Sequence, residues 1–491
     1  MSSFSSSLDL ADVLTALRAQ DREAAYNLLV LLQKHPQTHV VNAATFPEVI
    51  EHVVPTGPRL TALALNVVKA VGDLQPALSE GWAGAPTLVS VLIALIEGTD
   101  LALADKAGEA MESLVVGASS SAKAVLGVFW RASDAHLKSS GDMTLFLRYA
   151  CTFARIMGRG GRLFASCDAL GAPNRLVEVC QRCNDVLAQI VFMELLTELG
   201  KSAAPLSFLV ASGTVDWLAA TAAGGDGLQA TPALHALAEI LTVAGTRGLL
   251  LASDNCDDLV TRLVGTRSFV PTLATFLDSR DDADRSAGIY ALTSFAVANK
   301  LALTRVAQDA ALCAAFFAII NLGKAEATSA VLLSVARILE AFNGTGAGNS
   351  CNSMGAAEAK AETETASSSS VAGNVEDSEV VSMKQQLFLQ LGKAKQGGTV
   401  AYLIKTARMP VPETRVASHR LLAALVQQPS GWGLREVFTN GSGFRAFLTD
   451  RDTEHNKEGK VHYPCSYHVI STSTSNPQPQ PACLPRTQSL P

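Results

Sequence analysis

The chain has 491 residues, of which 48% are hydrophobic and 17% charged, so it can bury an extensive core. Its net charge of −6 argues against nucleic acid as a partner, and nine scattered cysteines indicate reduced thiols in a cytosolic or nuclear protein. The longest apolar runs, Leu88–Ile96 and Ala310–Ile320, are shorter than the roughly 20 residues of a membrane-spanning helix. The N-terminus has no basic start typical of a signal peptide. We therefore expect a protein of the cytoplasm, with the nucleus as a further location, that binds no membrane.

Apolar residues recur at helical spacing through most of residues 8–342. One helix is predicted from Asp185, as N-cap, to Gly200. A second is predicted over Thr231–Gly245, with Thr231 as N-cap and Pro232 in the first helical position. Alternating β-type runs with Asn-Gly or Asp-Gly turns are absent, so the fold class is all-α.

Two further helices are predicted over Asp281–Asn299 and Thr328–Phe342. Similar short segments open several units, and their shared Ala recurs at Ala165, Ala211, Ala252 and Ala307. These offsets of about 46, 41 and 55 residues lie close to the armadillo and HEAT repeat period, except for the last. A single helix pair cannot bury its apolar face, so neighbouring repeats must stack. The sequence therefore predicts an armadillo- or HEAT-type α-solenoid.

Two segments interrupt the helical pattern. Residues 343–379 are rich in Gly, Ser, Ala and Glu, which predicts a disordered acidic insertion. The predicted layout is repeats over 1–342, this insertion, C-terminal repeats of the same solenoid over 380–460, and a disordered Pro/Ser/Thr-rich tail over 461–491.

Four patterns resemble chemical sites, and each has a simpler structural explanation. Cys180 and Cys183 have zinc-like spacing without a second pair, which favours buried thiols. His35 and His39 are separated by Pro36, which spoils a shared helix face.

The glycines of Gly158–Arg162 lack the Gly-Lys-Ser/Thr ending of a P-loop and favour a turn between helices. Asp281, Asp282 and Asp284 lack the central Gly and distal Glu of a calcium loop, which favours capping of a helix start. No motif of a hydrolase or metalloprotease is present, so we expect no enzyme, no metal and no cofactor.

In armadillo-type repeats the third helix of each repeat lines the binding groove. Side chains outside the apolar stripes of the predicted third helices are therefore candidates for contact with a partner, although an ordinary solvated face explains each of them equally well. They are His235, Glu239, Arg285, Tyr290 and Arg337.

The region 412–460 carries the most specific pattern. A helix rich in Ala and Leu ends at Gln428-Pro429 with Trp432, and Ser442-Gly443-Phe444 follows. A string of charged residues then follows, Asp450-Arg451, Glu454-His455, Lys457 and Lys460. In order and spacing this region resembles the C-terminal repeats of the 26S proteasome non-ATPase regulatory subunit 5 family. The resemblance ends at Lys460, after which the family continues with helical sequence.

The resemblance implies an armadillo-like chaperone that assembles the base of the proteasome regulatory particle. Such a protein binds the C-terminal region of an ATPase subunit and leaves before the mature complex forms; we expect it to be a monomer when free. The alternative is a general armadillo adaptor for transport or trafficking. An importin-like carrier would show regularly spaced Trp and Asn, whereas the four Trp residues here are irregularly spaced, at Trp82, Trp130, Trp217 and Trp432.

Overall fold

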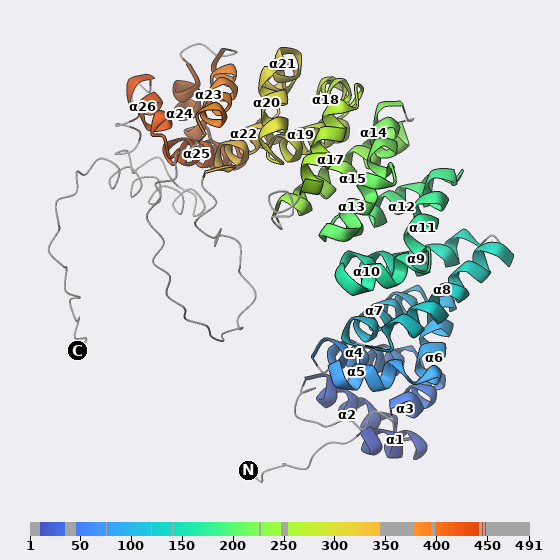
Figure 1. Ribbon diagram of the computed structural model, residues 1–491. Coiled ribbons are helices and arrows are strands. Elements are labelled where there is room, and N and C mark those ends of the chain that lie inside the picture. The colour runs from blue at the N-terminus through green and yellow to red at the C-terminus, as the bar shows by residue number, and fades with distance from the viewer. Residues whose placement is uncertain are drawn as a thin grey trace, which may run out of the picture. The chain divides into compact units, whose positions relative to one another are not determined.

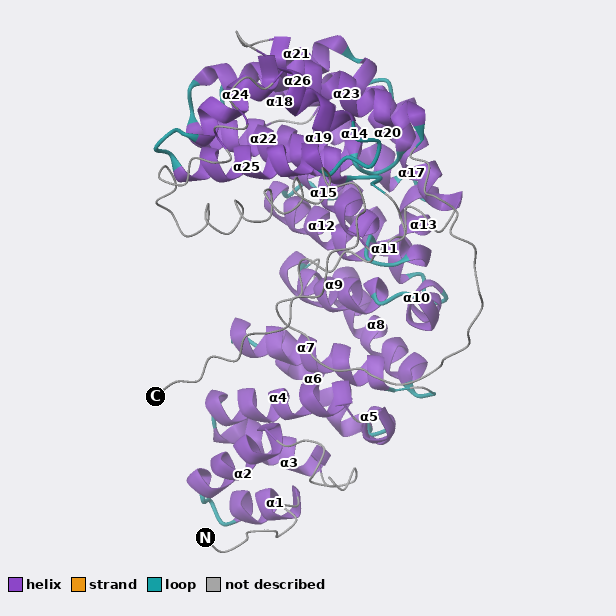
Figure 2. Cartoon of the chain, turned by 90° about the vertical axis from the view of Figure 1, so that its left-hand side faces the viewer, coloured by secondary structure: helices purple, strands orange, loops and turns teal. Residues whose placement is uncertain are grey.

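A computed structural model describes most of the chain, and every regular element in the described part is helical (Figures 1 and 2). The described residues are 10–34, 46–74, 76–118, 120–139, 142–224, 227–246, 254–343, 377–393, 398–440, 444 and 447. Most of the predicted acidic insertion, the predicted tail and the pair His35 and His39 lie outside them.

The chain divides into two compact units, Met1–Phe269 and Val270–Pro491. The helices of the first unit are α1 (Leu10–Arg18), α2 (Arg22–Lys34), α3 (Phe46–Val53), η1 (Val54–Thr56), α4 (Pro58–Leu74), α5 (Pro76–Ala83), α6 (Pro86–Glu97), α7 (Leu101–Gly117), α8 (Ala122–Ser139), α9 (Met143–Gly158), α10 (Gly161–Asp168), α11 (Ala172–Arg182), α12 (Val186–Leu199), α13 (Ala203–Ala211), α14 (Thr214–Gly224), α15 (Gly227–Thr246) and α17 (Asp254–Gly265).

The second unit begins within α18 (Phe269–Asp278). It continues with α19 (Asp282–Ala296), α20 (Lys300–Gln308), α21 (Ala310–Ala318), η2 (Ile319–Leu322), α22 (Ala325–Glu340), α23 (Ser378–Lys393), α24 (Gly398–Ala407), α25 (Pro412–Val426) and α26 (Trp432–Asn440).

In each unit the third helices of successive repeats pack against one another. In the first unit α4 contacts α7, α7 contacts α9, α9 contacts α12, and α12 contacts α15. In the second unit α19 contacts α22, and α22 contacts α25. Stacking of this kind buries the apolar faces that no single repeat can cover, which makes the fold an all-α solenoid of the armadillo/HEAT type.

Polar contacts between repeats recur at the repeat period. Lys69 pairs with Glu109, 40 residues later, at 2.7 Å, and the side chains of Gln189 and Gln229 are hydrogen-bonded across the same interval. Lys324 pairs with Asp282 across 42 residues. Each contact links equivalent positions of adjacent repeats, so the contacts show directly the period that the sequence shows only approximately.

The N-caps predicted for two helices are confirmed. The carboxylate of Asp185 accepts hydrogen bonds from the amides of Leu187 and Ala188 at the start of α12. Asp281 does the same for Ala283 and Asp284 at the start of α19. These acceptors satisfy amides that have no partner within the helix.

The predicted start of α15 is wrong. The helix begins at Gly227, four residues before Thr231, and Pro232 lies inside it and not in its first position. A proline inside a helix removes the hydrogen bond to the residue four positions earlier, here Leu228. Leu228 is 68% exposed, so this first turn lies at the surface. The start predicted for α22 is also late, by three residues.

Carbonyl groups at helix C-termini are capped by side chains from later repeats. Arg148 donates to the carbonyl oxygens of Ile96 and Gly98 at the end of α6, and Arg162 donates to that of Ala118 at the end of α7. Carbonyls at this end of a helix lack partners within the helix, so these arginines stabilise the joint between repeats.

No single described helix is long and apolar enough to cross a membrane. Two bent pairs meet the length and composition criteria only when each is counted as one segment. They are Ala203–Ala211 with Thr214–Gly224, bent by 62°, and Lys300–Gln308 with Ala310–Leu322, bent by 79°.

Candidate functional site

Tyr290 and Arg337, two of the predicted site residues, lie in one hollow of the second unit. Its volume is about 260 Å³, and it is formed by three stacked third helices. We call it the arginine hollow. Its lining residues are Ser286, Ile289, Tyr290 and Thr293 of α19, Ala330, Leu333, Ser334 and Arg337 of α22, and Arg420 of α25.

The floor of the arginine hollow is fixed by the core, whereas its rim is accessible. Ile289 and Thr293 are buried at 5% and 3% exposure because they also pack between α19 and α22. Leu333 is 36% exposed, and Tyr290 and Arg337 are half-buried. An aromatic ring, an aliphatic side chain and a guanidinium therefore face the same open space.

The two arginines of the hollow have different surroundings. The guanidinium of Arg420 contacts both carboxylate oxygens of Glu340, at 3.3 and 3.1 Å. By contrast, no hydrogen bond or ion pair joins the guanidinium of Arg337 to another residue in the described part of the chain. Among the described residues, Glu340 neutralises one of the two arginines, and the other has no anionic partner.

The prediction that Arg285 faces a groove is wrong. Its side chain is buried at 7% exposure, and it donates to the carbonyl oxygen of Ser279 at 2.7 Å and to the carboxylate of Asp282. Asp282 also pairs with Lys324, and these two cations lower the pKa of its carboxyl. Arg285 therefore ties the start of α19 to the preceding turn. Helical spacing placed it off the apolar stripe, but it cannot show that a charged side chain folds back on its own helix.

His235 and Glu239 lie one turn apart on α15 in the first unit. His235 is exposed and Glu239 half-buried, while Leu234, Leu237 and Ile240 of the same helix are buried. The pair therefore shares a polar face, as the four-residue spacing predicts. Its part in partner binding stays a prediction.

Arg420 and Leu333 were not among the predicted residues. Leu333 belongs to an apolar pattern that helical spacing assigns to the core, although the side chain is 36% exposed. Arg420 lies 83 residues after Arg337 in the chain, and only the contact of α22 with α25 brings them together. The sequence offers one signal for Arg420, namely a charged residue next to the apolar run at the end of α25.

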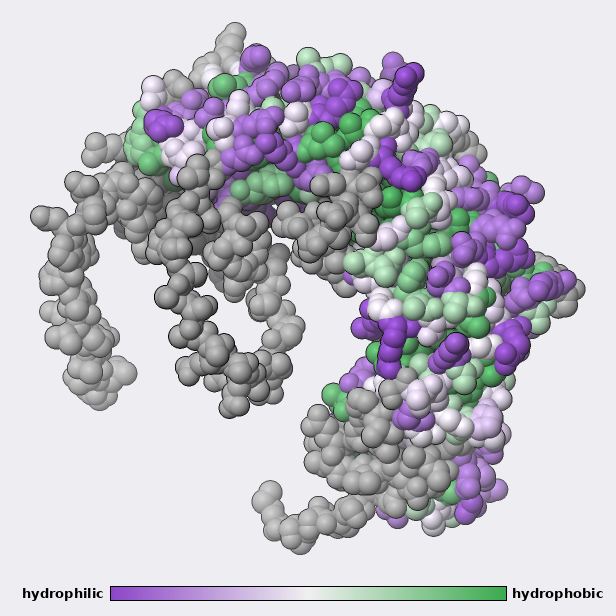
Figure 3. Space-filling model, viewed as in Figure 1, coloured by the Kyte–Doolittle hydropathy of each residue, from purple (hydrophilic) through white to green (hydrophobic). Residues whose placement is uncertain are grey.

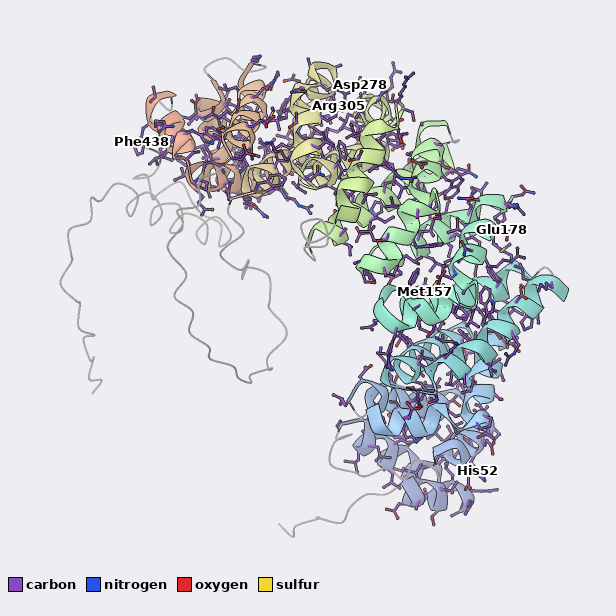
Figure 4. The ribbon with its side chains drawn as sticks, in the orientation of Figure 1. His52, Met157, Glu178, Asp278, Arg305 and Phe438 are labelled. Atoms are coloured by element: carbon purple, nitrogen blue, oxygen red, sulfur yellow. The ribbon has the colours of Figure 1, made fainter. Side chains whose placement is uncertain are left out.

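Two other hollows lie at the ends of the described chain. Near the N-terminus, Arg59 stacks on the ring of Tyr26 at 4.7 Å, beside Arg22 and the opposite charge of Glu23. Near α26, a hollow of about 280 Å³ is lined by residues that include Leu389 and Trp432. Leu389 and, on the outer side of α26, Phe438 (Figure 4) are about half exposed, at 50% and 52%.

The cysteine environments favour structural thiols. Burial raises the pKa of Cys167 and of Cys180 to about 12, and that of Cys313 to about 11. These thiols remain protonated near neutral pH, so they are poor nucleophiles. The Cys180 and Cys183 pair gains no further ligand, because no group of three or more potential metal ligands occurs among the described residues.

Polar and apolar residues are interspersed over the face of the second unit that Figure 3 displays.

Gly158–Arg162 forms the turn from α9 to α10, with Gly160 and Gly161 at positive φ, in agreement with its predicted role.

No family model and no curated protein matches the chain. Among solved structures, an engineered protein is 15% identical, with 94% of this chain and 98% of that chain covered and a TM-score of 0.44. A designed armadillo repeat protein is 11% identical, with 60% and 98% covered and a TM-score of 0.40. Another, in complex with the peptide (KR)4, has the same identity and coverage and a TM-score of 0.41.

Proposed function

We propose that this chain is a protein-binding scaffold, in which the stacked third helices supply the contact surface. The observation that carries the proposal is the arginine hollow. There, α19 presents the ring of Tyr290 to solvent, and α22 presents Leu333 and Arg337, beside Arg420 of α25. In repeat proteins, side chains exposed along a row of stacked helices commonly make up a partner-binding surface.

The size of the hollow favours a polypeptide over a small molecule. Its volume of about 260 Å³ is below the roughly 300–1,000 Å³ of typical small-molecule sites. It is also open, so it would bury only part of a metabolite. Side chains projecting from a partner fit such a hollow, while the rest of the partner lies along the neighbouring helices.

We further propose that the partner is an ATPase subunit of the proteasome base, and that the chain acts as an assembly chaperone absent from the mature particle. The support for this is the resemblance of residues 412–460 to the non-ATPase regulatory subunit 5 family. Two residues of that pattern have structural roles that explain their presence. Gln428 is buried and caps the end of α22, and Trp432 is buried against Phe388.

On this proposal the free protein is a monomer of the cytoplasm, and also of the nucleus, that captures the C-terminal region of the ATPase subunit. The same fold would serve a general transport or trafficking adaptor equally well. The adaptor is therefore the second candidate, and it differs only in the partner bound.

The test is direct binding of the purified full-length chain to the isolated C-terminal region of each base ATPase subunit, measured by interferometry. We expect one subunit to bind and the chain to be missing from purified mature 26S particles. Binding of none of the subunits by a well-folded chain would reject the chaperone and leave the adaptor.

Two variants link any such binding to the proposed surface. Tyr290→Ala and Leu333→Ser should each weaken it, because both remove apolar contact area from the hollow. Leu187→Ser is the matched control, since Leu187 is 75% exposed and belongs to the first unit. Equal losses in all three variants would place the binding surface elsewhere.

A further inference from the structure

The surroundings of Arg337 indicate the chemistry of the partner. The side chain is half-buried between α19 and α25, and its guanidinium has no hydrogen-bond acceptor among the described residues. A guanidinium carries five N–H donors, and partial removal from water without acceptors costs free energy. Proteins therefore usually pair such an arginine, and the guanidinium of Arg337 lines the open hollow.

The second arginine reinforces this charge. Arg420 lines the same hollow, and its only anionic contact in the described chain is Glu340, which is not itself a lining residue. The other side chains of the hollow that can form hydrogen bonds are neutral, namely Tyr290 and the hydroxyls of Ser286, Thr293 and Ser334. With two arginines and no acidic residue in this lining, the site should repel a basic peptide and attract an acidic one.

We propose that the arginine hollow binds an acidic peptide segment, with a side-chain carboxylate of the partner on Arg337 and an adjacent apolar side chain against Tyr290 and Leu333. The planar guanidinium suits a carboxylate because it can donate two parallel hydrogen bonds. This inference rests on the proposed scaffold function and adds to it the chemical class of the partner.

The role of Glu340 follows from the same geometry. The carboxylate of Glu340 forms an ion pair with Arg420 in the free protein, and a carboxylate of the partner would compete with it for that guanidinium. Because both side chains are well exposed, their pair is weak and exchangeable. On this proposal Glu340 limits the affinity of the hollow for acidic segments.

The experiment is selection of a random 12-residue peptide library on the immobilised full-length chain, with counter-selection on Arg337→Gln. We expect enriched peptides to contain Asp or Glu next to a large apolar residue. Neutral or basic consensus peptides, or no peptide that depends on Arg337, would overturn the proposal.

The best selected peptide is then compared with a copy in which Asn and Gln replace its acids. By fluorescence anisotropy, Arg337→Gln should weaken the acidic peptide about tenfold or more and leave the neutral copy within about twofold. Arg337→Lys should recover part of the affinity, because one charge remains but the two-point contact is lost. Glu340→Gln should tighten binding.

Arg182→Gln is the matched control variant, because that arginine is 79% exposed in the first unit. Circular dichroism and unfolding midpoints must match wild type for every variant that is compared. Equal binding of the acidic and neutral peptides, or equal losses in Arg337→Gln and Arg182→Gln, would contradict the inference.

The outcome separates the two proposals. Capture of an ATPase region with equal affinity by wild type and Arg337→Gln would keep the scaffold function and reject the acidic site. Acidic peptides that depend on Arg337, with no ATPase bound, would keep the site and reject the proteasome partner.

Discussion

The side-chain amide of Gln428 donates a hydrogen bond of 2.9 Å to the carbonyl oxygen of Leu339, 89 residues earlier in the chain. The same amide group accepts from the buried ammonium of Lys384 at 3.4 Å. One side chain after α25 is therefore linked to the end of α22 and to the middle of α23. Gln428 therefore joins α22 to α23, the helices before and after residues 344–376, which lie outside the described residues.

Replacement of Gln428 by Ala should lower the free energy of unfolding by about 1–3 kcal/mol, because it leaves a buried carbonyl and a buried ammonium without one partner each. Urea denaturation followed by circular dichroism measures the change. Gln427→Ala is the control, since Gln427 is exposed. Equal midpoints for the two variants would show that Gln428 does not hold the joint.

The close approach of α9 to α12 gives a second prediction. A Cβ atom on Gly158 would collide with the backbone carbonyl of Glu198, and backbone atoms cannot move aside as a side chain can. Gly158→Ala should therefore destabilise the chain by about 1–3 kcal/mol. In Gly224→Ala the new methyl group meets no atom of the described residues within 4 Å, so this control should be neutral or slightly stabilising. A change in melting temperature of the same sign and size in both variants would contradict the prediction.

Alkylation should separate the described cysteines by burial. Cys151 and Cys183 are half-buried, whereas Cys167, Cys180 and Cys313 are buried and hold their protons well above neutral pH. Burial also raises the pKa of Cys151. Among these five thiols, N-ethylmaleimide at pH 7.5 should therefore modify Cys183 first, and it should reach Cys167, Cys180 and Cys313 only on unfolding. Mass spectrometry of peptides over a time course checks the order, with a guanidinium-denatured sample as the control. Early modification of Cys180 would disprove the packing around α11.

The pair Lys69–Glu109 predicts a pH dependence of stability. The hydrogen bond from Lys69 lowers the pKa of Glu109, so this carboxylate stabilises the fold above its unfolded pKa and loses that effect as pH falls through the lowered value. The pKa of Lys69 is raised, so its contribution is present below the unfolded pKa and is lost as pH rises through the raised value.

Because both side chains are partly exposed, Glu109→Gln should cost less than about 1 kcal/mol at pH 7. The difference from wild type should shrink as pH falls through the lowered pKa of Glu109, and it should vanish where the carboxyl is protonated in both folded and unfolded chains. Urea unfolding over a series of acidic pH values measures it. A difference that does not shrink as pH falls would assign the effect to packing.

The helical class, the repeat character and two helix starts could be predicted from local sequence. Caps such as Asp185 and Asp281 act on amides two and three residues away, so their signal is local. The start of α15 could not be predicted in this way. Thr231 and Pro232 form a good helix-start signal, but the helix extends back through them to Gly227. In this added turn Ala230 is buried and Gln229 is hydrogen-bonded to Gln189 of α12, so tertiary contacts override the local preference.

The candidate site was predictable only in part. Helical spacing indicated Tyr290 and Arg337 because both lie off the buried stripes of their helices. It could not show that the two share a hollow, because that depends on the packing of α19 against α22. Helical spacing also indicated Arg285 as a groove residue, although its contacts with Ser279 and Asp282 hold that side chain in the interior.

The contacts between repeats also determine how each unit responds to mechanical load. Pairs such as Lys69–Glu109 and Gln189–Gln229 reach only the next repeat along the chain. Tension applied to one end of a unit is therefore resisted by one joint at a time, and a joint can open while those beyond it stay closed. A force on one end of a unit could thus open a few repeats without unfolding the rest.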